Sequence, residues 1–291
     1  MSSIKWYANR IKSYIGRPRL IIQEKPIILT EGNRCENPIF IAGVHRSGTS
    51  LVRRMFNSHP DIACPPETYY LEYYAKMYSN PDVEAGYEGL GYDKSAMRED
   101  LSRKASELHE AYRISQGKSV WADKTPQYTF NLDSIDDLFN REAKYFIVLR
   151  HPCDIVFSIF KRGWNFGSSI DPFEAAISHV NTGIQCLLNF EKSHPSRCSR
   201  INYFSLCSDP ASTLDTALKK LSLQYSEEML RFSEKKHNFG TEDPVVRGKT
   251  SVTLSSGSWK ELSPDKLQRL RTVFGDDIDQ EDYWSNEQYN N

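Results

Sequence analysis

A phosphate-loop pattern lies near the start of the chain. Gly43 and Gly48 frame a short turn, and the hydroxyl residues Thr49 and Ser50 follow it. An apolar run precedes the turn and apolar residues at helical spacing come after it, so we expect it to connect a buried strand to a helix. Backbone N–H groups from Arg46 to Ser50 would then be unpaired and would point, with the positive end of the helix dipole, at whatever lies above the turn. This stretch predicts an anion-binding site.

One position departs from the pattern of the nucleoside triphosphatases. Those enzymes carry lysine after the second glycine, and a magnesium ion that is often held by an aspartate at the end of another strand. Here Thr49 replaces the lysine, and the apolar run 145–149 ends in Arg150, which is no metal ligand. We therefore expect a less charged anion that needs no metal, such as a sulfuryl donor. A magnesium-dependent kinase on the same loop is the rival hypothesis.

Two segments together resemble the sulfotransferases that use 3′-phosphoadenosine 5′-phosphosulfate, especially their microbial and protein-tyrosine branch. The segments are 43–51, Gly-Val-His-Arg-Ser-Gly-Thr-Ser-Leu, and 149–158, Leu-Arg-His-Pro-Cys-Asp-Ile-Val-Phe-Ser. The resemblance implies that the first segment holds the 5′-phosphosulfate, and that Arg150 and Ser158 hold the 3′-phosphate. It also implies metal-independent transfer to a hydroxyl or phenol, carried by a small molecule, a glycan, a lipid or a tyrosine.

Glu67 is the residue that we expect to act as general base. It stands in a proline-rich turn after the loop, where it is the side chain best able to accept a proton. The resemblance supports this role, because the branch has a Glu-Thr pair at a similar distance from its loop. The structural alternative is that Glu67 only caps the helix that starts near the next residue.

Lys124 and Arg46 complete the expected catalytic group. Lys124 ends a predicted strand, at the sheet edge where ligands bind in open α/β sheets, and by resemblance it contacts the oxygen that bridges sulfur and phosphorus. A solvated surface lysine is the alternative. His45 and His151 border the same region as other candidate bases. A nucleotide-binding protein without activity is a further hypothesis, but such a protein should have lost Glu67 or Lys124, and both are present.

Later motifs extend the expected donor site. Tyr203 precedes an Asp-Pro helix start and resembles the tyrosine that lies beside the adenine in the family. Residues 233–258 are polar and lack periodicity, which predicts a long loop that closes over the nucleotide. The segment 257–260 resembles a late Gly-x-Trp-Lys turn of the family, and Arg247 and Lys249 are other basic residues of this loop. The expected donor-binding residues are Arg46, Ser47, Gly48, Thr49, Ser50, Arg150, Ser158, Tyr203, Ser256 and Lys260.

These side chains need a scaffold that brings them together. Strand candidates are the apolar runs 38–42, 118–122, 145–149 and 200–204. Helical patterns between them predict a P-loop-like α/β domain of three layers, with a central, mainly parallel sheet and helices on both faces. Residues 68–117 would form a helical insertion or lid after the first strand, loop and helix.

The remaining expectations concern the chain as a whole. Its 291 residues fit a single domain, with an N-terminal arm at 1–37, a packing helix at 127–140 and a frayed C-terminal tail at 276–291. The balance of 37 basic and 38 acidic residues gives no general affinity for nucleic acid. Six cysteines show no spacing typical of a metal site. Without a transmembrane run or a signal-peptide region, a cytoplasmic protein is expected, and a homodimer is left open.

Overall fold

The computed structural model describes most of the chain after the predicted N-terminal arm. The described residues are, in order, 37–166, 171–238, 240, 248, 250–280 and 283–285. They belong to one compact unit that spans 31–291. Apart from Asn37, the predicted arm lies outside the described residues, and so do Arg247 and Lys249.

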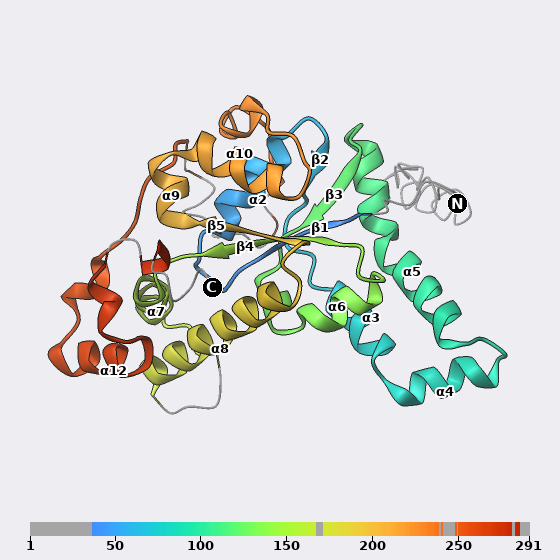
Figure 1. The fold of residues 1–291 in the computed structure, drawn as a ribbon, viewed down its shortest axis with the longest axis horizontal. Coiled ribbons are helices and arrows are strands. Elements are labelled where there is room, and N and C mark those ends of the chain that lie inside the picture. Colours follow the sequence, from blue (N-terminus) through green and yellow to red (C-terminus); the bar gives the residue numbers. More distant parts are fainter. Residues whose placement is uncertain are drawn as a thin grey trace, which may run out of the picture. The chain divides into compact units, whose positions relative to one another are not determined.

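A five-stranded parallel sheet forms the centre of this unit (Figure 1). The strand order is β2-β3-β1-β4-β5, and neighbouring strands run parallel throughout. The strands are β1 (Ile39–Ala42), β2 (Ile62–Ala63), β3 (Val120–Asp123), β4 (Lys144–Leu149) and β5 (Cys198–Asn202). The predicted parallel sheet is confirmed, and the first three predicted strands agree with β1, β3 and β4 to within about two residues, as expected of element boundaries.

The last predicted strand needs a correction. The run 200–204 does not stay extended to its end, because α9 (Tyr203–Ser208) begins inside it. Asn202 caps this helix: its side-chain oxygen accepts a hydrogen bond of 2.9 Å from the N–H of Phe204. Tyr203 is therefore a helical residue and not a strand residue. The structure also adds β2, which is too short to show any sequence pattern.

Helices cover both faces of the sheet, as predicted. Figure 1 shows α2, α9 and α10 on one face and α6 and α8 on the other. The α-helices are α2 (Thr49–Ser58), α3 (Leu71–Tyr78), α4 (Pro81–Gly89), α5 (Lys94–Ser115), α6 (Leu132–Leu138), α7 (Pro152–Lys161), α8 (Pro172–Ser193), α9 (Tyr203–Ser208), α10 (Pro210–Lys220) and α12 (Pro264–Phe274). Short 3₁₀ helices occur at Pro126–Phe130, Glu227–Met229, Ser258–Glu261, Asp276–Asp279 and Tyr283–Ser285. In the described part of the chain, no helix combines the length and the apolar character needed to span a bilayer.

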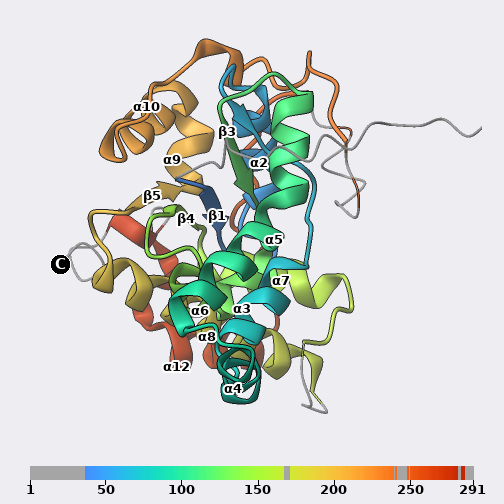
Figure 2. The same cartoon turned by 90° about the vertical axis from the view of Figure 1, so that its right-hand side faces the viewer.

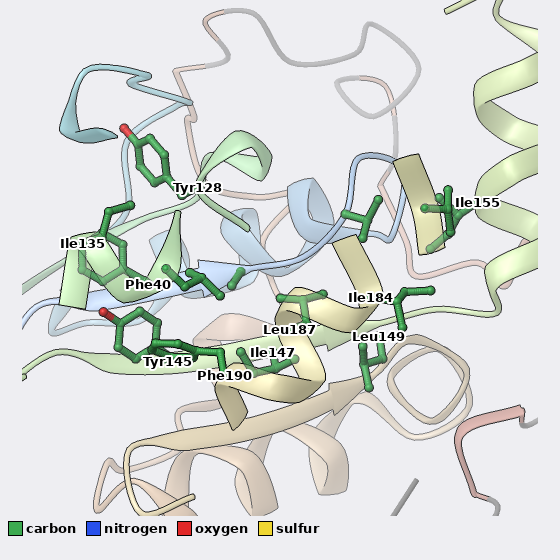
Figure 3. Packing of buried hydrophobic residues seen from close by; sticks show 14 of the residues in the cluster. Phe40, Tyr128, Ile135, Tyr145, Ile147, Leu149, Ile155, Ile184, Leu187 and Phe190 are labelled. Carbon is green, nitrogen blue, oxygen red and sulfur yellow. The ribbon is translucent and has the colours of Figure 1, made fainter. Parts of the chain in front are cut away.

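Strand residues alternate between two buried layers. In β4, Tyr145 and Ile147 belong to the core under α8, whereas Phe146 and Val148 belong to the core under α2, α9 and α10. Figure 3 shows Phe190 of α8 beside Tyr145, and their ring centroids are 4.6 Å apart. Burial on both faces explains why the strands read as continuous apolar runs. It also leaves the carboxyl edge of the sheet as the place for polar side chains.

The insertion 68–117 folds as α3, α4 and α5. Figure 2 shows α5 beside β3, and side chains join the two elements. Trp121 of β3 donates a hydrogen bond of 2.8 Å from Nε1 to Glu110 of α5, and its ring lies 4.5 Å from the ring of His109. The helical content of the insertion is confirmed, and α5 packs as part of the core.

Two further expectations are wrong in part. The stretch 127–140 is not one helix, because Asn131 (φ −136°, ψ 25°) separates a 3₁₀ helix from α6. The tail from 276 onward does not fray at once: Ile278 is buried, and the hydroxyl of Tyr283 donates a hydrogen bond of 2.7 Å to the carbonyl of Phe274. These buried contacts hold the first part of the tail, while 286–291 lies outside the described residues.

Candidate active site

The phosphate loop joins β1 to α2, as the sequence predicts, and its two glycines allow close packing. A Cβ on Gly43 would lie 3.0 Å from the carbonyl oxygen of Val148 in β4. Gly48 adopts a φ of 100°, and a Cβ there would lie 2.5 Å from the ring of Tyr203. Both positions therefore require glycine, the second for its backbone conformation as well as for space.

Ser47 departs from what the sequence predicts for the phosphate loop. Its N–H donates a hydrogen bond of 3.0 Å to the carbonyl of Val44, so the expectation of unpaired N–H groups from Arg46 to Ser50 is wrong here. Its hydroxyl is buried without a hydrogen-bond partner in the described residues, and lies 2.7 Å from the position of a Cβ on Gly43. The side chain lines neither of the pockets described below, so Ser47 lies apart from the other expected donor residues.

A pocket of about 450 Å³ opens over the loop, and we call it the anion pocket. The expected donor residues that line it are Arg46, Gly48, Thr49, Ser50, Arg150, Ser158 and Tyr203. The structure thus brings together residues from the loop, the end of β4, α7 and α9. Over the ranges described, no group of three or more His, Cys, Asp or Glu side chains is arranged to hold a metal ion.

Arg150 is held in place at the end of β4. One terminal nitrogen donates 2.8 Å to the carbonyl of Arg46 and the other donates 2.6 Å to the carbonyl of Ser255. The guanidinium carbon lies 4.9 Å from the ring centroid of Tyr203. The Nε atom is buried and has no hydrogen-bond partner among the described residues, so a phosphate oxygen in the anion pocket would satisfy it.

Two basic residues of the anion pocket were missed in the sequence. Lys161, the last residue of α7, and Arg162, which follows the helix, line it together with Ser158, which stands three and four residues earlier. This spacing on a predicted helix was the available signal, because residues three and four apart share one helix face. With Arg46 and Arg150, the pocket has four basic side chains.

Besides Ser47, two of the expected donor residues, Ser256 and Lys260, lie outside the anion pocket. Ser256 lines a small neighbouring cavity of about 10 Å³, and the ammonium of Lys260 lies 5.7 Å from the ring centroid of Trp259. Ser255 and Ser258 line the anion pocket instead. The late loop therefore reaches the pocket, through neighbours of the residues that the resemblance indicates.

A second pocket, of about 630 Å³, meets the first, and we call it the aromatic pocket. The two pockets share four lining residues, Arg46, Thr49, Ser50 and Arg162. Side chains with rings make up much of the remaining wall, namely His45, Tyr69, Trp164 and Phe166. Glu67 lines the aromatic pocket and not the anion pocket. A group held at the shared wall would thus be exposed to both pockets.

Glu67 and Lys124 form a buried ion pair beside this wall. The ammonium of Lys124 donates to Oε1 of Glu67 and, at 3.2 Å, to the hydroxyl of Ser50. The hydroxyl of Tyr69 donates to Oε2 of the same carboxylate. Lys124 is 0% exposed, so it is not a solvated surface lysine, and it lines neither pocket. Glu67 does not cap the next helix, which begins at Leu71.

The surroundings of Glu67 keep it ionised. Burial by itself would raise its pKa, but the positive charge of Lys124 and the hydrogen bonds from Lys124 and Tyr69 outweigh burial. The pKa of Glu67 therefore lies below its ordinary value. At neutral pH the carboxylate is present and can accept a proton.

The two histidines considered as bases have different surroundings. Burial, followed by the neighbouring His179, lowers the pKa of His45 to about 4, and Nδ1 of His45 lies 3.2 Å from Nε2 of His179. Burial also lowers the pKa of His151 to about 4. Nδ1 of His151 accepts from the N–H of Cys153 at 3.2 Å, and Nε2 donates to the carbonyl of Ile278 at 2.8 Å. Both ring nitrogens of His151 are thus engaged in structural contacts.

Comparison with known proteins adds independent information. Residues 38–227 match a family model described as the sulfotransferase family. A putative protein-tyrosine sulfotransferase of Caenorhabditis briggsae is 24% identical over 207 residues, which cover 68% of this chain and 70% of that protein. Protein-tyrosine sulfotransferase 1 of Danio rerio is 23% identical over 200 residues, which cover 67% of this chain and 56% of that protein. The chain therefore spans only part of the length of these relatives.

Solved structures with a similar fold include other sulfotransferases. The sulfotransferase domain from the Synechococcus PCC 7002 olefin synthase superposes with a TM-score of 0.60 at 20% identity, over 84% of this chain and 96% of that domain. The mouse sulfotransferase SULT7A1, complexed with PAP, superposes with a TM-score of 0.51 at 13% identity, over 85% of this chain and 86% of that protein. At these identities the likeness supports the fold.

Proposed function

The chain belongs to the sulfotransferase family, and on that premise we propose that it transfers a sulfuryl group from 3′-phosphoadenosine 5′-phosphosulfate to a hydroxyl group of an acceptor. One structural observation carries the proposal. The anion pocket and the aromatic pocket share a wall formed by Arg46, Thr49, Ser50 and Arg162, and Glu67 lines only the aromatic pocket. A donor in the first pocket and an acceptor in the second would meet at that wall, beside a carboxylate.

The anion pocket suits a donor that carries phosphate groups. It combines four basic side chains with a glycine-bounded helix start, and the buried Nε of Arg150 lacks a partner in the described residues. The complex of the mouse sulfotransferase SULT7A1 with PAP supports a nucleotide of this kind. PAP is the donor nucleotide without its sulfuryl group. Arg46, Gly48, Thr49 and Ser50 would hold the sulfate and the 5′-phosphate, while Arg150 and Ser158 would bind the 3′-phosphate.

In the proposed reaction, the acceptor oxygen forms a bond to sulfur while the bond from sulfur to the bridging phosphate oxygen breaks. The acceptor proton passes to Glu67, and the electron pair of the broken bond stays on the departing phosphate. Arg46, at the shared wall, would stabilise negative charge at the leaving oxygen. The buried ammonium of Lys124 would add to this effect through its hydrogen bond to the hydroxyl of Ser50. Positioning and charge stabilisation supply most of the catalysis, as in phosphoryl transfer.

The acceptor would lie in the aromatic pocket. Trp164 and Phe166 offer flat apolar surfaces there, which suit a ring or another apolar group beside the reacting hydroxyl. The protein-tyrosine sulfotransferases among the similar proteins support a phenol as one acceptor. Small molecules, glycans, lipids and tyrosine all remain within the proposal.

A binding experiment separates the proposed activity from its rivals. Isothermal titration calorimetry should show binding of PAP without magnesium, and no binding of ATP with magnesium. A cell extract incubated with ³⁵S-labelled donor should then yield labelled products that mass analysis can identify. Binding of ATP with magnesium but not of PAP would favour a kinase. Binding of PAP without any labelled product would indicate a nucleotide-binding protein without activity.

Three expectations about the whole chain continue as proposals from its sequence. We propose a cytoplasmic location, to be tested by cell fractionation, and light scattering will decide the open question of a homodimer. We also propose that 1–291 folds as a single domain, which limited proteolysis would test.

A further inference from the structure

A buried carboxylate, Asp123, lies next to the catalytic pair and has no role in the reaction described above. Its side chain is 0% exposed. Oδ1 accepts a hydrogen bond of 2.8 Å from the hydroxyl of Thr125. Oδ2 accepts one of 2.6 Å from the hydroxyl of Thr68 and one of 2.8 Å from Nε2 of His109. Asp123 is thus satisfied by side chains from three separate segments.

The two threonines are the direct neighbours of the catalytic pair in sequence. Thr68 follows Glu67, and Thr125 follows Lys124. The N–H of Thr68 also donates a hydrogen bond of 3.1 Å to the hydroxyl of Thr125. The backbone segments that carry Glu67 and Lys124 are therefore joined to each other through the Asp123 carboxylate and two hydroxyl groups.

His109 connects this arrangement to the insertion 68–117. Nδ1 of His109 lies 2.6 Å from the hydroxyl of Tyr70, and its ring lies 4.5 Å from the ring of Trp121. Burial and the charge of Asp123 raise the pKa of Tyr70, so the phenol keeps its proton beside Nδ1. Nε2 of His109 faces the carboxylate of Asp123 and donates its hydrogen there. One contact to the carboxylate thus comes from α5, in the insertion between β2 and β3.

A tight turn at Tyr69, next to Thr68, brings the hydroxyl of Tyr69 to the Glu67–Lys124 ion pair. The N–H of Tyr70 donates a hydrogen bond of 2.8 Å to the carbonyl of Thr68, and Tyr69 between them has a φ of 62°. This backbone conformation is unfavourable for a residue other than glycine and persists only where the surroundings hold it. The hydroxyl of Tyr69 donates to Glu67, so the turn directs a hydrogen bond onto the proposed base.

We propose that a four-residue unit, which we call the Asp123 cluster, positions the Glu67–Lys124 ion pair for sulfuryl transfer. The Asp123 cluster consists of Thr68, His109, Asp123 and Thr125. None of its members lines the anion pocket or the aromatic pocket, so the cluster acts through the ion pair and not on the substrates. The proposal rests on the proposed function, because it gives the ion pair the role described there.

The test compares Thr68→Val, which removes the hydroxyl and keeps the shape, with Thr68→Ser, which keeps the hydroxyl. Tyr145→Phe is the matched control, because it removes a buried hydroxyl that lies 3.1 Å from the carboxylate of Asp136, away from both pockets. Turnover is measured with saturating labelled donor and an acceptor from the extract screen. Thr68→Val should lower kcat by about 10- to 100-fold and change the Kd for PAP by less than about 2-fold. Thr68→Ser should recover most of kcat.

A second readout does not depend on activity. NMR of ¹³C-labelled glutamate side chains follows the titration of Glu67, whose neighbours are Lys124, Tyr69 and His45. If Thr68→Val loosens the ion pair, the lowering effect of Lys124 weakens, and the pKa of Glu67 should rise relative to the native protein. Tyr145→Phe should leave this pKa unchanged.

The outcomes separate this proposal from the proposed function. A native Glu67 titration and a native kcat in Thr68→Val would overturn the positioning role, and so would an equal loss of kcat in Tyr145→Phe. If Thr68→Val does not fold, Thr125→Val removes the other hydroxyl and is judged by the same measurements. Failure of the native protein to bind PAP would instead count against the proposed function, while the NMR comparison would still decide the role of the cluster.

Discussion

The Nε atom of Arg46 donates a hydrogen bond of 3.0 Å to the hydroxyl of Ser158, which stands 112 residues later in the chain. Arg46 lies in the loop after β1, with a left-handed backbone (φ 72°), and Ser158 lies on α7. The bond joins the two segments that the family resemblance assigns to opposite ends of the donor. In the structure, both ends of the expected donor site therefore line one pocket.

This contact predicts that the two residues act together in binding. Arg46→Ala and Ser158→Ala should each weaken the binding of PAP, and the double variant should lose less than the sum of the two effects. Contacting residues typically show a coupling of about 0.5 to 3 kcal/mol. Isothermal titration calorimetry at one salt concentration gives all four free energies of binding, and strictly additive losses would argue against a shared role.

Glu67→Gln tests the proposed base without changing the shape of the side chain. Loss of a general base typically lowers kcat by about 10²- to 10⁴-fold, and the Kd for PAP should change little. Glu110→Gln is a control, because Glu110 is another mostly buried carboxylate, bonded to Trp121 and Arg113, outside both pockets. Near-native turnover of Glu67→Gln, with chemistry rate-limiting, would remove Glu67 from the mechanism and favour His45.

Arg150→Ala tests the contact to the 3′-phosphate. The substitution removes a charged donor from the anion pocket, so PAP should bind more weakly by about 2 to 3 kcal/mol, or roughly 30- to 150-fold in Kd. Arg200→Ala removes an arginine that pairs with Glu191 at 2.7 Å outside this pocket, and it should leave binding unchanged. Equal affinities for PAP in the two variants would contradict the assignment.

Gly48→Ala separates a steric clash from backbone strain. The new methyl group would lie 2.5 Å from the ring of Tyr203, at a φ of 100°. Gly91→Ala is the matched control, since Gly91 has a φ of 88° but no atom within 4 Å of the added Cβ. Both variants should lose about 1 to 2 kcal/mol of stability from strain. Only Gly48→Ala should also weaken PAP binding, and native affinity in this variant would mean that the ring of Tyr203 moves aside freely.

Buried histidines predict how stability depends on pH. Burial holds the pKa of His45 and His151 at about 4, below the ordinary value of 6.5. Between these values the unfolded chain binds more protons than the folded chain. The free energy of unfolding should therefore fall as the pH drops from about 6.5 to about 4, by up to about 1.4 kcal/mol per pH unit for each histidine.

His151→Gln provides the control for this dependence, because glutamine takes up no proton in that range. Urea unfolding of the variant should show lower stability at neutral pH, through loss of the contacts to Cys153 and Ile278, but a shallower decline with falling pH. Identical slopes for the native protein and the variant would show that the pKa of His151 is not lowered on folding.

The sequence by itself determined the local parts of this protein. The apolar runs of β1, β3 and β4, the parallel sheet and the glycine-bounded loop follow from patterns that neighbouring residues create within about ten positions. The placement of Arg150 and Ser158 in one pocket could also be predicted from the sequence. Arg150 follows a predicted strand, and Ser158 lies on the helix after it, where the spacing of residues is regular. Lys161, at the end of the same helix, and Arg162, which follows it, could have been found from their spacing to Ser158.

Only the tertiary structure decided how distant segments meet. The ion pair of Glu67 with Lys124 and the contact of His109 with Asp123 bridge segments that carry no mutual pattern in the sequence. The same holds for three residues that the resemblance assigned to the donor site. Ser47 lines neither pocket, and Ser256 and Lys260 do not line the anion pocket. Side-chain direction in loops depends on packing against other elements, whereas periodicity describes only regular elements.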